Sequence, residues 1–187
     1  MEHNNYSGRS NKEMVVSVDQ IKELRRVSLA SIADCRKALM EADGDFDKAI
    51  QLLRKRGLEI AAKRQGSTAK EGRVEVYLHM GNKIGVLVEV SSETDFVARN
   101  EDFIQFTKDI AMQIAACDPA YVKGEEVPAE MLETAKDKEQ FLKANCLMEQ
   151  PFIKDPSLSI KDLLGGLVAK YKENIVIRRF VRYKIGG

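Results

Sequence analysis

The stretch Thr94-Asp95-Phe96-Val97-Ala98-Arg99-Asn100 joins two apolar runs that differ in period. Residues 84–90, which precede it, form an apolar run that predicts a buried strand. Residues 103–114, which follow it, place apolar side chains at helical spacing. We therefore predict a strand-to-helix corner at this stretch. Such corners commonly carry exposed functional groups, because connecting segments lie on the protein surface.

Phe96 is the side chain of interest in this corner. Asp95 lies beside it and Arg99 follows one turn later, so an aromatic ring is surrounded by charged groups. This pattern is typical of an anchor that binds another protein. The alternative is that Phe96 belongs to the core at the start of the helix, and the residues alone leave both interpretations open.

The overall composition excludes several classes of partner. The chain has 187 residues, of which 44% are apolar, and its charged residues cancel to a net charge of +1. We therefore expect no bulk attraction to nucleic acid or to an acidic membrane. No apolar segment is long enough to span a bilayer, and the polar start does not resemble a signal peptide. Cys35, Cys117 and Cys146 are far apart, which favours free thiols in a reducing compartment, and we expect a cytoplasmic location.

Residues 15–57 predict a compact module of three short helices. Each helix begins at a residue able to cap its free N–H groups, and the third is expected to end at Gly57. The capping residues are Ser17, Ser31 and Asp45. We interpret the polar residues 1–14 as a disordered arm and residues 58–72, rich in Ala, Lys, Arg, Gly and Ser, as a flexible linker that could begin as a helical tail.

From residue 74 the apolar period changes to two, which indicates a β-hairpin. Gly81-Asn82 is interpreted as its two-residue turn, and residues 84–90 as the returning strand. Residues 175–185 are rich in β-branched and aromatic side chains and predict a last strand. The adjacent Arg178-Arg179 indicates a β-bulge in that strand. The alternating apolar residues of the first strand are Val74, Val76 and Leu78.

Three helices are predicted between the hairpin and the last strand, at residues 103–114, 129–149 and 160–173, with residues 151–156 as a connector. Gly165-Gly166 would weaken the third of these helices and could allow another backbone to approach closely. The predicted fold class is α+β. A UBA-like three-helix module precedes a core domain, residues 73–187, in which a three-stranded antiparallel sheet is covered on one side by helices.

The sequence contains no recognisable catalytic constellation, phosphate loop or zinc spacing, so we expect a binding module without metal or cofactor. DNA binding is disfavoured because nearby acidic residues offset Arg36 and Lys37. Two alternatives remain. One is a ubiquitin-binding patch formed by Arg25, Leu29 and Ile32. The other is an enzyme with an unrecognised site around Cys117 and Cys146.

Three segments, in order, carry a resemblance to a known family. They are Glu23-Leu24-Arg25 with Asp34-Cys35-Arg36-Lys37-Ala38-Leu39 and Gly44-Asp45; Thr94 to Asn100; and Glu149-Gln150-Pro151-Phe152 with Glu173-Asn174-Ile175 and Arg178-Arg179-Phe180. Over residues 15–185 the chain resembles bacterial elongation factor Ts, the guanine-nucleotide exchange factor for elongation factor Tu. It departs from the family where Ser28-Leu29-Ala30-Ser31 replaces the usual Thr-Gly-Ala-Gly, where Ile32-Ala33 replaces two methionines, and where Lys172 replaces a frequent Gly.

The resemblance implies a partner, GDP-bound elongation factor Tu, and two contact surfaces. On the three-helix module, the implied contacts are Lys22, Arg25, Ile32, Ala33, Arg36 and Arg64. At the corner they are Thr94, Asp95, Phe96 and Val97, where Asp95 and Phe96 would press between two helices of the partner and disturb its magnesium and phosphate site. Short family members look like homodimers, so a homodimer with a two-fold interface is also implied.

Overall fold

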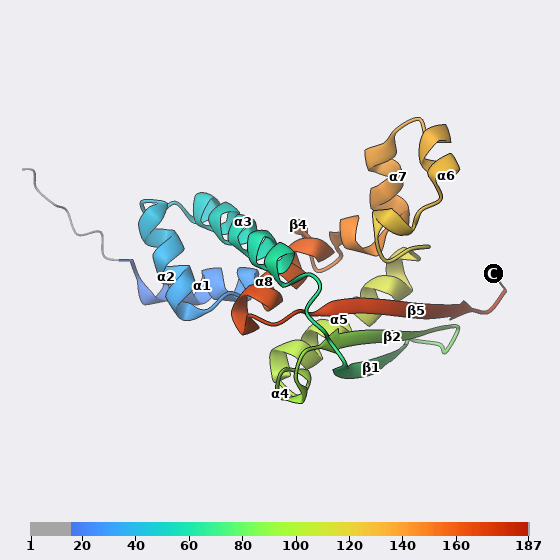
Figure 1. Ribbon diagram of the computed structural model, residues 1–187, viewed down its shortest axis with the longest axis horizontal. Coiled ribbons are helices and arrows are strands. Elements are labelled where there is room, and N and C mark those ends of the chain that lie inside the picture. Colours follow the sequence, from blue (N-terminus) through green and yellow to red (C-terminus); the bar gives the residue numbers. More distant parts are fainter. Residues whose placement is uncertain (1–15, 187) are drawn as a thin grey trace, which may run out of the picture.

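The computed structural model describes residues 16–186. The predicted arm at residues 1–14 therefore lies outside the described residues. Three helices come first, and a three-stranded sheet with its own helices follows, so the class is α+β as predicted. Figure 1 shows the first three helices at one end of the molecule and the sheet extending away from them.

The N-terminal module consists of α1 (Val18–Ser28), α2 (Ile32–Glu41) and α3 (Phe46–Arg64). Its helices begin where their capping residues predict, because the side chains of Ser17, Ser31 and Asp45 each accept a backbone N–H from the first turn. The buried core of the module is formed by Leu24, Ala30, Cys35, Ala38, Leu39, Ala42, Ala49 and Leu53.

The end of the third helix was predicted wrongly. Helix α3 does not stop at Gly57 but continues to Arg64, so the first half of the predicted linker is helical. Gly57 is buried and faces α8 (Ile160–Tyr171). A Cβ atom at Gly57 would lie 3.0 Å from the backbone of Gly165. The glycine is therefore a contact between two helices and not a helix stop, and α3 connects the module to the core domain (Figure 1).

The main sheet has the strand order β1-β2-β5 and is antiparallel throughout. Its strands are β1 (Glu71–Leu78), β2 (Ile84–Ser92) and β5 (Val176–Lys184). The predicted bulge is confirmed, because Glu89 pairs with Arg179 but Val90 pairs with Ile177, which leaves Arg178 as the extra residue. The bulge keeps the apolar Ile177 on the buried face of the sheet.

The hairpin turn is longer than predicted. The His79 N–H donates to the Ile84 carbonyl at 2.9 Å, so residues 80–83 form a four-residue loop. Gly81 and Asn82 both have positive φ, 84° and 56°, as tight hairpin turns require. The turn residues were thus located correctly, but the loop extends one residue further on each side.

Helix α5 (Glu101–Cys117) packs against β1 and β2, and α8 completes the core beneath the sheet. The largest fully buried apolar side chains of this core are Val88, Val90, Val97, Phe103, Ile110, Ile114, Leu147, Ile160 and Leu167. The opposite face of the sheet is exposed and largely apolar, and it also carries the ion pair between Glu89 and Arg179. Val76 is 64% exposed, because β1 directs Glu75 and Tyr77 toward the helices and its valines outward.

The charged segment 129–149 is not one helix. It forms α6 (Ala129–Thr134), α7 (Lys138–Asn145) and the 3-10 helix η2 (Leu147–Glu149), after a short 3-10 helix η1 (Gly124–Glu126). The helix breaks at Ala135, whose backbone is extended, and Asp137 caps the next helix by accepting the Gln140 N–H. The predicted connector 151–156 also differs, since β3 (Pro151–Phe152) and β4 (Asp155–Ser159) form a small two-stranded sheet.

Candidate partner-binding surface

The corner between β2 and α5 contains its own short helix, α4 (Asp95–Ala98). Thr94 caps α4 by accepting the Val97 N–H at 3.4 Å, and Val97 is buried as an anchor beneath the turn. Phe96 points outward and is 73% exposed, so the alternative that it belongs to the core is excluded. Asp95 forms an ion pair with Arg99 at 3.0 Å, one turn along.

Thr94 is fixed by a residue far away in the sequence. Its backbone N–H donates to Glu173 Oε2 at 3.0 Å and its hydroxyl donates to Glu173 Oε1 at 2.7 Å. The neighbouring Glu93 accepts the Asn174 N–H at 2.6 Å. The corner is thus held from the segment that links α8 to β5, while the side chains of Asp95 and Phe96 remain exposed.

The resemblance assigns six module residues to partner binding, and five of them are exposed while the sixth is ion-paired. Lys22, Arg25, Ile32, Ala33 and Arg36 are exposed on α1 and α2. Arg64, at the end of α3, instead lies 3.9 Å from the Glu93 carboxylate in an ion pair beside the corner.

A groove connects the module to the core domain near the corner. Its module side is lined by Val18, Ile21, Lys22, Arg25, Arg26, Leu29 and Ile32, and its core side by Asp102 and Lys170. Lys170 forms an ion pair with Asp102. Burial lowers the pKa of Lys170, and the charge of Arg25 across the groove lowers it further. Basic and apolar groups of the module therefore lie close to the first turn of α5, which directly follows the corner.

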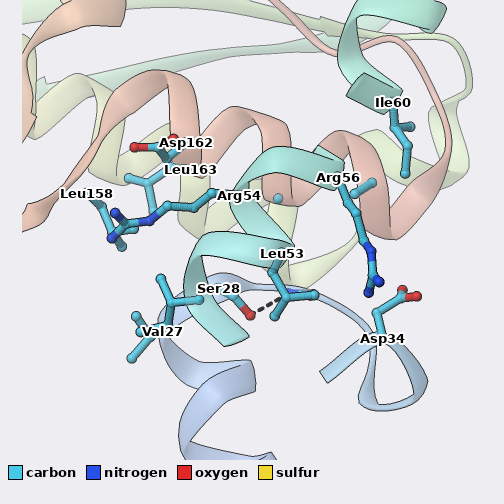
Figure 2. Close-up of a pocket in the computed structure, with 14 residues that line it drawn as sticks. Val27, Ser28, Asp34, Leu53, Arg54, Arg56, Ile60, Leu158, Asp162 and Leu163 are labelled. Carbon is cyan, nitrogen blue, oxygen red and sulfur yellow. Dashed lines mark hydrogen bonds between the residues drawn. The ribbon is translucent and has the colours of Figure 1, made fainter. Parts of the chain in front are cut away.

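The module packs directly against the core domain through α3 and α8, and a small cavity lies in this interface. Figure 2 shows its lining, with Arg54 of α3 lying beside Asp162 of α8. Arg54 donates to the Ser157 carbonyl at 2.7 Å, and α3 packs along α8. These contacts join the module to the core domain.

Two observations concern metal binding and the cysteine thiols. Within residues 16–186, no cluster of three or more His, Cys, Asp or Glu side chains could hold a metal ion. Burial raises the pKa of the Cys117 and Cys146 thiols, so both are protonated at neutral pH and neither is the thiolate that a nucleophile requires. The same part of the chain contains no helix with the length and apolar character needed to cross a bilayer.

Comparison with known proteins gives a consistent result. Residues 10–139 match the family model described as Elongation factor TS. The chain belongs to the elongation factor Ts family. It is 48% identical to Elongation factor Ts of Caldanaerobacter subterraneus, over 92% of this chain and 98% of the relative. It is 45% identical to Elongation factor Ts of Desulfotalea psychrophila, over 93% of this chain and 100% of the relative. Family membership places the chain among the elongation factors of protein biosynthesis.

Sequence reasoning located the exposed corner but missed the residues that support it. Tyr171, Glu173 and Asn174 hold the corner from about 75 positions away, and no local pattern signals such a contact. The segment Glu173-Asn174-Ile175 stood out only because it matches the family. Asp102 and Lys170 were also missed, since each is an unremarkable charged residue of a helix until the fold brings them together.

Proposed function

We propose that the chain is a guanine-nucleotide exchange factor that binds GDP-bound elongation factor Tu and promotes GDP release. The observation that carries the proposal is the exposure of Phe96 on a fixed corner, in a chain of the elongation factor Ts family. A large apolar side chain exposed on a tethered turn is suited to act as a wedge, because it needs little reorganisation before it is buried by a partner.

In the proposed mechanism, Asp95 and Phe96 enter between two helices of the partner's nucleotide-binding domain. Their entry displaces groups that hold the magnesium ion and the phosphates, so GDP loses part of its electrostatic clamp and dissociates faster. Thermodynamic linkage requires that GDP weaken the binding of this chain by the same factor. Such couplings are typically about 1–3 kcal/mol, or roughly 5–150-fold in affinity.

The module supplies the second contact with the partner. Lys22, Arg25 and Arg36 are exposed cations, and Ile32 and Ala33 add an apolar surface at the start of α2. Arg64 has a different role in the proposal, because its ion pair with Glu93 brings the end of α3 to the corner. Two contacts on one rigid body would position Phe96 on the partner more accurately than one contact could.

We further propose a homodimer formed through the exposed face of the sheet. Val76, Leu87 and Val181 pair across the three strands and form an apolar row on that face. The next row contains Leu78 and Tyr183, the latter 71% exposed. Because an apolar face of this kind usually marks an interface, a second copy of the chain related by a two-fold axis is the proposed occupant.

The ubiquitin-binding alternative receives less support from the structure. Of its three proposed residues, Arg25 and Ile32 are exposed, but Leu29 is half-buried and packs against the core of the α+β domain. The proposed partner is a protein, and the net charge of +1 gives no general attraction to nucleic acid or to a membrane surface. The proposal places the chain in the cytoplasm.

Binding measurements test the proposal through linkage. The chain is titrated into nucleotide-free and into GDP-bound elongation factor Tu, with ubiquitin titrated in parallel. We expect the GDP-bound protein to bind at least about 5-fold more weakly than the nucleotide-free protein. Equal affinity for the two states would contradict exchange activity, and binding to ubiquitin alone would favour the alternative.

A further inference from the structure

One short segment holds both ends of the turn that carries Phe96. Thr94 caps α4 and Asn100 caps α5, so these two residues bracket the turn. Glu173 binds Thr94 through two hydrogen bonds. Tyr171 donates to the Asn100 side chain, and its hydroxyl also lies 3.0 Å from Asp102 Oδ2. Both capping residues are therefore held by side chains from the end of α8 and the segment after it.

The Glu173 contact determines how the Thr94 hydroxyl is used. A hydroxyl has one hydrogen and two acceptor lone pairs. The hydrogen is donated to Glu173 Oε1 at 2.7 Å, which leaves the lone pairs free to accept the Val97 N–H that caps α4. The other carboxylate oxygen accepts the Thr94 N–H at 3.0 Å. Glu173 thus orients both the backbone and the side chain of the capping residue.

The short helix depends on this support. Helix α4 has four residues, Asp95 to Ala98, and a single turn is not stable by itself because helix nucleation is unfavourable. Its direction must come from its cap and from the burial of Val97 and Ala98. Hydrogen bonds to a carboxylate are among the stronger and more directional ones, so Glu173 is well suited to fix the direction in which Phe96 projects.

We propose that Glu173 is a positioning residue for nucleotide exchange, acting through Thr94 to orient Asp95 and Phe96. This inference rests on the proposed function. It also assigns Thr94 a role inside the molecule, since both polar groups of Thr94 that could face a partner are already bonded to Glu173. Misplacement of a reactive group by about 1 Å can lower a rate by about 100-fold, so loss of the contact should affect the rate of release more than binding.

Steady-state exchange kinetics with Glu173→Ala and Glu173→Gln test the inference. We expect Glu173→Ala to lower the maximal rate of GDP release by about tenfold or more, with the KM for elongation factor Tu changed less than about twofold. The Gln amide oxygen can accept one of the two hydrogen bonds, so Glu173→Gln should retain an intermediate rate. Glu130→Ala removes the same charge from the exposed first turn of α6, away from the corner, and should exchange at the parent rate.

A double-mutant cycle separates positioning from a general structural role. If Glu173 acts through Thr94, adding Glu173→Ala to Thr94→Ala should cause a smaller loss than it causes in the parent, because only the bond from the Thr94 backbone N–H to Glu173 remains to be lost. The inference would be overturned if the two substitutions lowered the exchange rate independently, so that their effects multiplied. It would also be overturned if Glu173→Ala exchanged nucleotide as fast as an active parent chain. Should Glu173→Ala fail to fold, Glu173→Gln provides the test by the same criteria. If the parent chain itself does not accelerate GDP release, the proposed function fails and the inference fails with it.

Discussion

At the scale of single residues, Phe96 is the side chain whose removal should separate activity from folding. It is 73% exposed, so Phe96→Ala should leave the thermal unfolding midpoint close to that of the parent. Truncation of a binding hot spot commonly costs about 2 kcal/mol or more, and we expect exchange to fall by at least about 30-fold. The measurement is GDP release from elongation factor Tu at equal concentrations of parent and variant.

Met80→Ala is the matched control for the Phe96 variant. Met80 is 91% exposed, and it lies in the hairpin loop at the end of the sheet away from α4. Its truncation also removes an exposed apolar side chain, but we expect exchange at the parent rate. If Phe96→Ala exchanged as fast as Met80→Ala, Phe96 would not be the wedge.

Two departures from the family pattern coincide with strained backbone. Leu29 and Lys172 replace family glycines, and both adopt left-handed φ angles, 57° and 56°. Such angles cost an L-residue roughly 1–2 kcal/mol, whereas glycine adopts them freely. The sequence comparison could identify the departures, but their energetic consequence became visible only with the backbone conformation. Leu29 compensates in part by packing against the core.

Lys172→Gly should therefore stabilise the chain. The side chain is exposed and leaves no cavity, so relief of the left-handed conformation should raise stability by about 1 kcal/mol. For a chain of this size we expect the thermal midpoint to rise by roughly 2–4 °C. Lys172→Ala keeps the strain and should not gain stability. A lower midpoint for the glycine variant would contradict this account of the helix end.

At the scale of elements, three glycines determine how the module sits on the core. A methyl group added to Gly166 would lie 2.4 Å from the Ser28 carbonyl oxygen. One added to Gly57 would lie 3.0 Å from backbone atoms of Gly165, and one added to Gly165 would lie 3.3 Å from the Gly57 carbonyl carbon. Alanine favours a helix over glycine by about 1 kcal/mol, whereas overpacking typically costs about 1–3 kcal/mol. The balance between the two effects should differ at each position.

Thermal unfolding of the three alanine variants tests this contact. We expect Gly165→Ala to melt close to the parent, Gly57→Ala to melt lower, and Gly166→Ala to be the least stable. Gly166→Ala should also slow exchange, because the module can accommodate the methyl group only by moving relative to the corner. Equal midpoints for all three variants would show that the helices do not approach as closely as the structure describes.

Local signals predicted where elements begin better than where they end. Ser17, Ser31 and Asp45 act within one turn, so their capping role could be predicted from the sequence. Gly57 was misinterpreted because a glycine can end a helix or allow another helix to approach, and the local sequence is the same in both cases. The alternation in β1 predicted a strand, but only the position of α5 shows that Val76 faces outward.

For the candidate site, too, the local features could be predicted from the sequence and the long-range contacts could not. The exposed corner could be predicted because Phe96 lies among charged neighbours within one short stretch. Its support could not, since Glu173 is 79 positions from Thr94 in the chain. Likewise, the groove between module and core depends on the packing of α3 against α8. This packing was not predicted, because residues 58–72 were interpreted as a flexible linker.

At the scale of the whole molecule, the exposed sheet face should govern association. Val76→Asp places a charge in the middle of the row formed by Val76, Leu87 and Val181, where burial in a dimer would be costly. We expect sedimentation equilibrium to show a dimeric parent and a largely monomeric variant. Met131→Asp, a similar change on the exposed side of α6, should remain dimeric. A monomeric parent, or a dimeric Val76→Asp, would contradict the proposed interface.

The proposed function requires that the folded chain accelerate nucleotide release from a partner. The most direct measurement is the release of a fluorescent GDP analogue from purified elongation factor Tu, with this chain added at catalytic amounts. We expect multiple-turnover acceleration by the parent chain and loss of that acceleration in Phe96→Ala. Release at the spontaneous rate, with a folded parent chain and a competent partner, would contradict it.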